Sequence, residues 1–163
     1  LWKVMATVNK NLSEFGDLPK VNPNWKIAIV KAEWNAEITD GLHDGAIDLL
    51  INAHVPGNNI KTFHVPGSFE LPLGAQWAIE KFKADAVICL GSVIRGETAH
   101  FDYVCQGVTD GVMQVSLSRS KPIGFGVLMC ETVEQAKARA GFADSFEDKG
   151  FDSALAALSV LNK

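Results

Sequence analysis

Short runs of β-branched and aliphatic residues alternate with longer amphipathic segments along most of this chain. The apolar runs span residues 26–30, 60–65, 84–93 and 123–130, and each precedes a segment whose apolar residues recur at helical spacing. Parallel strands need long connections, which helices usually supply with a right-handed crossover. The alternation therefore predicts an α/β fold, with a four-stranded parallel sheet and helices on both of its faces.

Local signals mark where several of the expected helices begin. Pro72 is tolerated in the first turn of the second helix, because the amide that it lacks has no helical acceptor there. Thr132 and Gln135 have the spacing of a capping box, in which each side chain bonds the backbone amide of the other. His100 stands at the expected start of the third helix, directly after the longest apolar strand.

The chain divides into an N-terminal arm, residues 1–24, and a single domain, residues 25–163. The arm is polar and contains Gly16, Pro19 and Pro23, so we expect irregular structure until Trp25. The whole chain of 163 residues is 47% hydrophobic, which is enough to bury one sizeable core.

Charge and cysteine usage exclude several classes of partner. The net charge is −4 and no block of Lys or Arg interrupts the chain, so we expect no nucleic-acid or anionic membrane surface. We find no pattern of a transmembrane span or signal peptide. The three cysteines, Cys89, Cys105 and Cys130, lie in apolar contexts without CxxC spacing. These features favour a reduced, cytoplasmic protein.

Ligands of parallel α/β proteins bind outside the carboxyl ends of the strands, in the loops that lead into helices. The corresponding loops here are residues 32–35, 66–70, 91–100 and 129–132. We therefore expect the chemically useful side chains to lie in these segments.

The loop of residues 91–100 has the composition of an anion-binding turn. Its two glycines permit tight backbone turns, while Arg95, Glu97, Thr98 and His100 offer side-chain donors and backbone amides near a helix start. The pattern is neither GxGxxG nor a P-loop. The alternative is a glycine-containing turn with solvated polar side chains.

His100 is the candidate for proton transfer, because an imidazole exchanges protons near neutral pH. The alternative is a capping or surface histidine. We predict no metal site, because the remaining histidines, His43, His54 and His64, fall on different elements and none has ligand spacing with His100.

Two adjacent loops each pair an aromatic residue with a polar one, Trp34 with Asn35 and Phe69 with Glu70. Such pairs suit a planar ligand, because the ring stacks on it while the polar group bonds its substituents. An aromatic residue at a strand end is, however, more often core packing. Asn35 has a second interpretation as the cap of the following helix.

Two cations near the C-terminus are ambiguous. Arg139 lies beside Gly141 at a helix end, where a cation complements the helix dipole without any ligand. Lys149 is open to both interpretations as well. Ser68 does not lie in a G-x-S-x-G sequence, so an esterase nucleophile is unsupported.

Five motifs in order, at family-like spacing, resemble the lumazine synthase family. They occupy residues 65–72 (VPGSFELP), 85–88 (DAVI), 91–103 (GSVIRGETAHFDY), 125–128 (FGVL) and 134–141 (EQAKARAG). Together they extend over most of residues 25–160, which makes the resemblance highly specific.

The resemblance implies a flavodoxin-like three-layer α/β/α sandwich and a transferase of riboflavin biosynthesis. The implied reaction condenses 5-amino-6-(D-ribitylamino)uracil with 3,4-dihydroxy-2-butanone 4-phosphate to 6,7-dimethyl-8-ribityllumazine, without cofactor or metal. The competing interpretation is a non-catalytic flavin- or lumazine-binding protein on the same scaffold, since an indole stacks on either ring system.

The resemblance also implies roles for single residues. Trp34, at a position where the family commonly has Phe, would stack on the pyrimidine ring, and Asn35 and Glu70 would bind the ribityl chain. Val93 and Ile94 would border the pyrimidine. The other residues implied to bind substrate in the same half of the site are Ser68, Phe69, Glu97 and Thr98.

Among these, Glu97 and Thr98 match the phosphate loop of the family and His100 matches its proposed acid/base. Phe125, Arg139 and Lys149 match residues that a neighbouring subunit supplies, with Arg139 counted as catalytic. The implied site is therefore intersubunit, and the implied protein is a homo-oligomer.

One departure from the family concerns residues 142–149, where the chain is longer by about two residues. In the family this connection bears on whether pentamers close into a sixty-subunit capsid. A longer connection resembles the forms that stop at pentamers, so the resemblance favours a pentamer.

Overall fold

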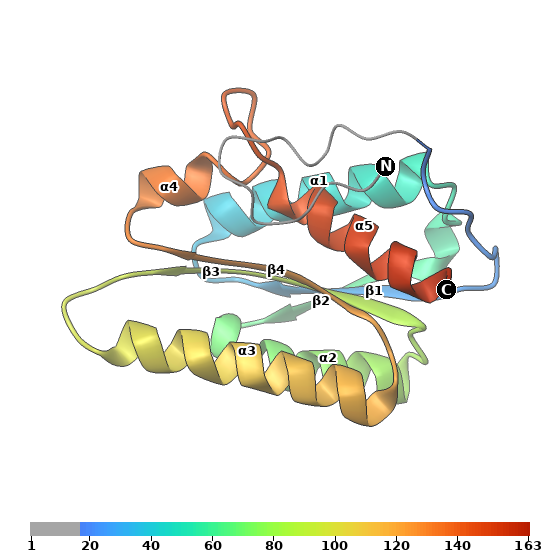
Figure 1. Ribbon diagram of the computed structural model, residues 1–163, viewed down its shortest axis with the longest axis horizontal. Helices are drawn as coiled ribbons and strands as arrows, with labels where there is room; N and C mark the ends of the chain where they lie inside the picture. Colours follow the sequence, from blue (N-terminus) through green and yellow to red (C-terminus); the bar gives the residue numbers. More distant parts are fainter. Residues whose placement is uncertain (1–16) are drawn as a thin grey trace.

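The computed structural model describes residues 17–163 and confirms the predicted α/β fold. One parallel sheet has the strand order β2-β1-β3-β4 (Figure 1). The strands are β1 (Ile27–Ala32), β2 (Ile60–Val65), β3 (Ala86–Ile94) and β4 (Ile123–Cys130). The helices are α1 (Ala36–Asn52), α2 (Leu71–Lys81), α3 (His100–Arg119), α4 (Val133–Lys137) and α5 (Lys149–Leu161), with short 3-10 turns η1 (Gly57–Asn59) and η2 (Ser68–Glu70).

The sheet separates two helical layers, as in a flavodoxin-like sandwich. Helices α1, α4 and α5 lie on one face of the sheet, and α2 and α3 lie on the other (Figure 1). Each face has its own core: Ile29 and Ile88 pack with α1 and α5, whereas Val30 and Val87 pack with α2 and α3. This alternation follows from the strand period of two, and it makes the central strands apolar on both faces.

The arm predicted for residues 1–24 lies mostly outside the described residues, and its boundary stays a prediction. The described part, residues 17–24, contains turns but neither helix nor strand. Leu18 and Val21 pack against the core beneath α1 and α5.

Two details of the predicted loops are wrong. Strand β3 continues to Ile94, so the first residues of the expected anion loop, 91–94, are strand. Glycine is required at position 91, because a Cβ there would overlap the Ser68 hydroxyl of η2. The second correction concerns Asn35, whose side chain makes no capping hydrogen bond to α1.

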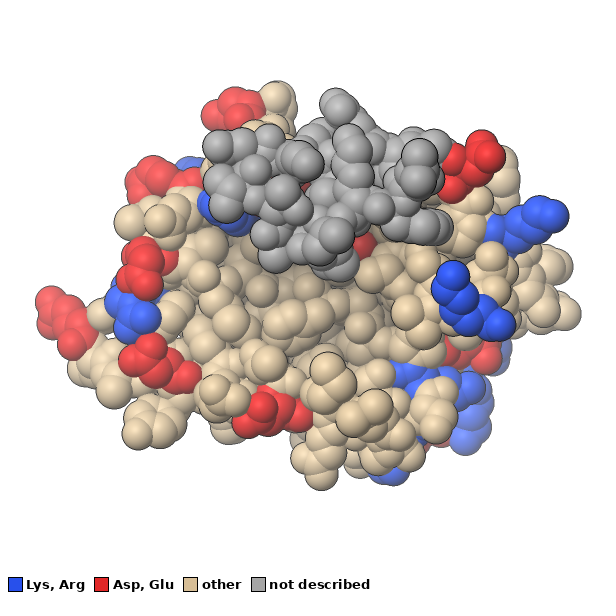
Figure 2. Space-filling model, viewed as in Figure 1, with Lys and Arg blue, Asp and Glu red and all other residues tan. Residues whose placement is uncertain are grey.

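The charged side chains do not form one continuous basic surface on the face seen in Figure 2. Acidic groups predominate along its left edge and basic groups along its right edge, and the part between them that is not drawn in grey is mostly uncharged. Any anion site on this face must therefore be local. No helix within residues 17–163 has the length and apolar character needed to cross a bilayer.

Candidate functional site

A cavity of about 500 Å³ opens at the carboxyl ends of β1 and β3, beside η2 and the start of α3. We call it the strand-end pocket. Its lining residues are Trp34, Asn35, Ser68, Phe69, Glu70, Ser92, Val93, Ile94, His100, Tyr103 and Val104. The structure thus brings together most of the residues that the sequence placed in one half of a site.

The two predicted stacking residues of this pocket are not core residues. Trp34 is 68% exposed and Phe69 is 60% exposed, which rejects the alternative of core packing. Gly67 makes room for the indole, since a Cβ there would overlap the ring of Trp34. Gly107 of α3 similarly accommodates the ring of Phe69. Large apolar faces that remain in solvent suit stacking on a planar ligand.

Asn35 is held in an unusual backbone conformation that directs its amide across the pocket. Its φ of 58° lies in the left-handed region, which asparagine tolerates better than most residues. Its Nδ2 donates to the carbonyl oxygen of Ser92 at 2.8 Å, which ties the end of β1 to β3. The amide oxygen of Asn35 remains available to accept from a hydroxyl or amine.

Glu70 has one carboxylate oxygen committed to local structure. Its Oε2 accepts a hydrogen bond from the backbone amide of Gly67 at 3.0 Å. This contact fixes the η2 turn and leaves Oε1 to face a ligand. An oriented carboxylate oxygen suits the hydroxyl groups of a polyol chain.

His100 is the first residue of α3, as predicted, and its side chain lines the strand-end pocket. The Thr98 hydroxyl accepts from the backbone amide of His100 at 3.3 Å, so Thr98 rather than the imidazole satisfies this helix start. Thr98 and Glu97 lie in the exposed turn before α3, outside the pocket lining. The imidazole therefore does not cap α3, and His100 is an exposed residue at the lining of the pocket.

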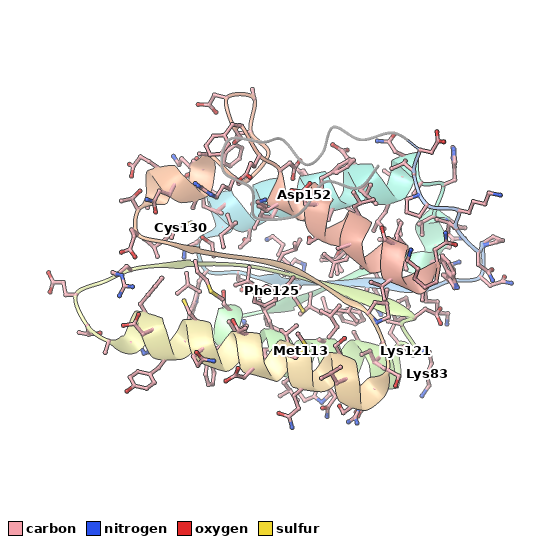
Figure 3. All side chains as sticks on the ribbon, in the orientation of Figure 1. Lys83, Met113, Lys121, Phe125, Cys130 and Asp152 are labelled. Carbon is pink, nitrogen blue, oxygen red and sulfur yellow. The ribbon has the colours of Figure 1, made fainter. Side chains whose placement is uncertain are left out.

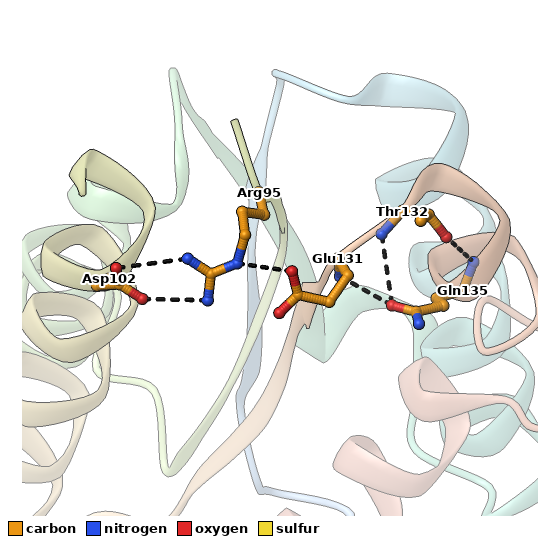
Figure 4. Close-up of polar contacts among 5 residues, drawn as sticks. All are labelled: Arg95, Asp102, Glu131, Thr132 and Gln135. Carbon is orange, nitrogen blue, oxygen red and sulfur yellow. Dashed lines mark hydrogen bonds and ion pairs between the residues drawn. The ribbon is translucent and has the colours of Figure 1, made fainter. Parts of the chain in front are cut away.

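Arg95, expected as an anion donor, is instead bound on both sides by carboxylates (Figure 4). Its Nε lies 2.6 Å from Glu131 Oε2, and its Nη2 lies 3.2 Å from Asp102 Oδ1. The guanidinium carbon also lies 4.3 Å from the centre of the Phe101 ring. Arg95 thus joins the end of β4 to the first turn of α3, beside the turn that carries Glu97 and Thr98.

The capping box predicted at the start of α4 is confirmed (Figure 4). The Thr132 hydroxyl accepts from the Gln135 amide at 3.2 Å, and Gln135 Oε1 accepts from the amides of Glu131 at 2.8 Å and Thr132 at 3.4 Å. This box fixes the short helix that precedes Arg139.

A second cavity, of about 290 Å³, lies along the edge strand β4. We call it the β4 pocket. It is lined by Phe125, Val127, Leu128, Met129, Cys130, Gln135, Arg139 and Lys149. The three residues that the resemblance assigned to a neighbouring subunit, Phe125, Arg139 and Lys149, thus meet here and not in the strand-end pocket. Figure 3 shows Phe125 at strand β4 and Asp152 on α5 above it.

Both cations of the β4 pocket have carboxylate neighbours. Arg139 Nε lies 3.6 Å from Glu147 Oε2, and Lys149 Nζ lies 3.2 Å from Glu147 Oε1 and 3.5 Å from Asp152 Oδ2. Arg139 Nη1 also donates to the carbonyl oxygen of Gln135 at 2.9 Å, so its structural role at a helix end is real. Among residues 17–163, its Nη2 has no hydrogen bond or ion pair, so this nitrogen can bind an anion in addition.

The sequence missed several pocket residues. Tyr103 and Val104 line the strand-end pocket, and their positions three and four residues after His100 on a helix are the signal that finds them. Asp152 follows Lys149 by three residues on α5, which is a comparable signal. Glu147 lies in an irregular connection, where no periodicity marks it.

The described residues offer no obvious metal or thiol chemistry. Within residues 17–163, no group of three or more His, Cys, Asp or Glu side chains is placed to hold a metal ion. Cys89, Cys105 and Cys130 are free thiols, and burial raises the pKa of Cys89 to about 12. A thiol with so high a pKa is a poor nucleophile. The useful groups are therefore the exposed rings, the imidazole and the two cations.

Comparison with known proteins agrees with this arrangement. The sequence model of the family described as 6,7-dimethyl-8-ribityllumazine synthase matches residues 24–163. The enzyme of that name from Cytophaga hutchinsonii is 46% identical over 158 residues, covering 96% of this chain and 98% of its own. The one from Streptomyces coelicolor is 48% identical over 136 residues, covering 83% of this chain and 82% of its own. This chain belongs to the 6,7-dimethyl-8-ribityllumazine synthase family.

Proposed function

We propose that this chain condenses 5-amino-6-(D-ribitylamino)uracil with 3,4-dihydroxy-2-butanone 4-phosphate to give 6,7-dimethyl-8-ribityllumazine, phosphate and water. The observation that carries the proposal is the strand-end pocket, in which Trp34, Asn35, Glu70 and His100 converge in a chain of this family. The indole stacks on the pyrimidine, and Asn35 and Glu70 bind the ribityl hydroxyls. Val93 and Ile94 border the ring, with Ser68 and Phe69 alongside.

The chemistry requires no covalent nucleophile from the protein. The amine of the uracil attacks the ketone and loses water to form an imine, the phosphate ester is eliminated, and the remaining amine closes the ring with loss of a second water. His100 moves protons between these groups. Most of the rate enhancement is orientation, with proton transfer contributing a further factor. The proposed reaction uses no cofactor and no metal.

The phosphate group is held between two subunits in this proposal. Glu97 and Thr98 of the turn before α3 approach it from one side. Phe125, Arg139 and Lys149 approach from the β4 pocket of the neighbouring subunit. The supporting observation is that Phe125, Arg139 and Lys149 line a cavity of their own within one chain, apart from the strand-end pocket.

A homo-oligomer is therefore part of the proposal, with a pentamer favoured over a sixty-subunit capsid because of the long connection between α4 and α5. The outer surface of α2 and α3 supports assembly. It carries Leu73, Trp77, Met113 and Leu117, all of which are about half exposed or more. Exposed apolar groups of this size are typical of contact surfaces. Light scattering should give a mass near five chains, and a mass near sixty would contradict the pentamer.

The location that we propose is the cytoplasm, in keeping with three free thiols in the described chain. The decisive experiment for the function mixes the purified protein with both substrates and follows lumazine absorbance. Formation no faster than the spontaneous reaction would refute the proposed activity. A yellow preparation that retains flavin but forms no lumazine would indicate a binding protein instead.

A further inference from the structure

A buried carboxylate lies between the two cations of the β4 pocket. Glu147 is only 5% exposed, and its two oxygens face different partners, with Oε2 3.6 Å from Arg139 Nε and Oε1 3.2 Å from Lys149 Nζ. This bridging arrangement is the one expected of a bound oxyanion. Glu147 belongs to the connection between α4 and α5.

The connection is a hydrogen-bonded structure that fixes the position of Glu147. The Gly141 amide donates to the Glu147 carbonyl oxygen at 3.1 Å, and the Lys149 amide donates to the Arg139 carbonyl oxygen at 2.9 Å. Ala140 and Asp148 form an antiparallel bridge. The Phe146 ring lies 5.2 Å from the Arg139 guanidinium. The backbone on both sides of Glu147 is thereby held, so its carboxylate is directed inward.

The charges of this cluster balance. Arg139 and Lys149 carry two positive charges, while Glu147 and the 2% exposed Asp152 carry two negative ones. Lys149 Nζ is buried and makes no directional hydrogen bond within residues 17–163, beyond these ionic contacts. The cluster therefore has no net positive charge to attract a phosphate. In addition, the Glu147 carboxylate already occupies the position between the two cations.

We propose that Glu147 sets the phosphate affinity of the β4 pocket, acting as an internal carboxylate that competes with the phosphate group for Arg139 and Lys149. The inference rests on the proposed function, because it concerns the same phosphate site. Its consequence is a weak hold on phosphate, so that the inorganic phosphate eliminated in the reaction leaves readily. Glu147 is a residue that determines affinity and does not touch the reacting atoms.

The test measures binding of inorganic phosphate alone to the assembled protein by calorimetry. Glu147→Gln removes the competing charge while keeping the size of the side chain, and we expect the Kd for phosphate to fall by about 5- to 20-fold. Asp144→Asn is the matched control, because it removes the same charge from an exposed position of the same connection. We expect it to change the Kd by less than about twofold. Adding Arg139→Ala to Glu147→Gln should abolish the gain and so locate the binding in this pocket.

An unchanged or weaker phosphate affinity in folded, assembled Glu147→Gln overturns the proposal, as does a lack of measurable binding by both proteins. If this variant does not assemble, Glu147→Asp shortens the side chain by one methylene and should give a smaller tightening of the same sign. A Kd for this second variant that is equal to or weaker than that of the parent also overturns the proposal.

Failure of the proposed function gives a different result. If the protein forms no lumazine, the phosphate titration is still readable, because it uses no organic substrate. If the protein does form lumazine, Glu147→Gln should lower the apparent KM of the phosphate-bearing substrate and make inorganic phosphate a stronger product inhibitor. Unchanged values of both in an active enzyme refute the role of Glu147 and leave the activity intact.

Discussion

The strand-end pocket and the β4 pocket lie in the same molecule but are built in different ways. The first is formed by strand ends and helix starts, and it presents exposed rings with few charges. The second is formed by one edge strand and an irregular connection, and it presents two cations beside two buried carboxylates. We therefore expect shape to select the ligand in the first pocket and a balance of charges to select it in the second.

The largest effect should come from removing His100, the proposed proton-transfer group of the strand-end pocket. His100→Ala should lower kcat by about 10²-fold with little change in KM, because general acid/base catalysis contributes at least this much while orientation survives. Steady-state kinetics on the assembled variant measures it. Complete loss of activity would show that orientation contributes less than we propose.

The next effect belongs to the β4 pocket. Arg139→Ala should raise the apparent KM of the phosphate-bearing substrate by about 10- to 50-fold, because a charge-assisted hydrogen bond is lost, and should leave the KM of the uracil substrate unchanged. The difference between the two KM values is the measurement. Equal changes in the two KM values would contradict the assignment of the two substrates to different pockets.

Replacing the exposed indole of Trp34 should give a smaller effect. It should change the KM of the uracil substrate and not that of the phosphate-bearing substrate. Trp34→Ala should raise the KM of the uracil substrate by about tenfold through loss of stacking, and Trp34→Phe should restore most of the affinity. The KM of the phosphate-bearing substrate serves as the internal control. If Trp34→Phe were as impaired as Trp34→Ala, stacking would not be the cause.

The smallest effect lies outside both pockets. Burial lowers the pKa of His43 below its ordinary value of 6.5, and the ring shares a hydrogen bond of 2.9 Å with the Thr62 hydroxyl. The unfolded chain then binds this proton more readily than the folded one, so stability should decline as the pH falls below about 6.5. Thermal unfolding from about pH 7 to pH 5.5 should show a shallower decline for His43→Gln than for the parent. An identical slope would contradict this assignment, and activity of the variant near neutral pH should not change.

The sequence predicted the sheet well because its strands are short apolar runs flanked by helix breakers. The bounds of β2 and β4 agree with the expected runs, and Pro66 and Pro122 flank them. Strand β3 ends at Ile94, one residue beyond the expected run of residues 84–93. Glycine at position 91 nevertheless suggested that the loop begins there, although this glycine is needed for the close approach of η2. Composition alone does not distinguish these two uses of glycine.

Only part of the candidate site could be predicted from the sequence. Residues that directly follow strands, such as Trp34 and Asn35, converge because parallel strands end at one edge of the sheet. The exposure of Trp34 and the bond from Asn35 to Ser92 depend on tertiary contacts that no local pattern encodes. The positions of Glu147 and of the carboxylates that bind Arg95 also depend on tertiary contacts.

The start of α5 also bears on how such a chain can change over evolution. Gly150 packs so closely on α1 that a Cβ would overlap the carbonyl oxygen of Leu42. This contact anchors the adjacent Lys149 to α1, in addition to the hydrogen bond from its amide to the Arg139 carbonyl oxygen. Residues 142–146 can therefore gain or lose length by mutation while the cation stays in register with the pocket. Insertions in this segment are therefore a route by which such a chain could change the surroundings of the two cations without moving them.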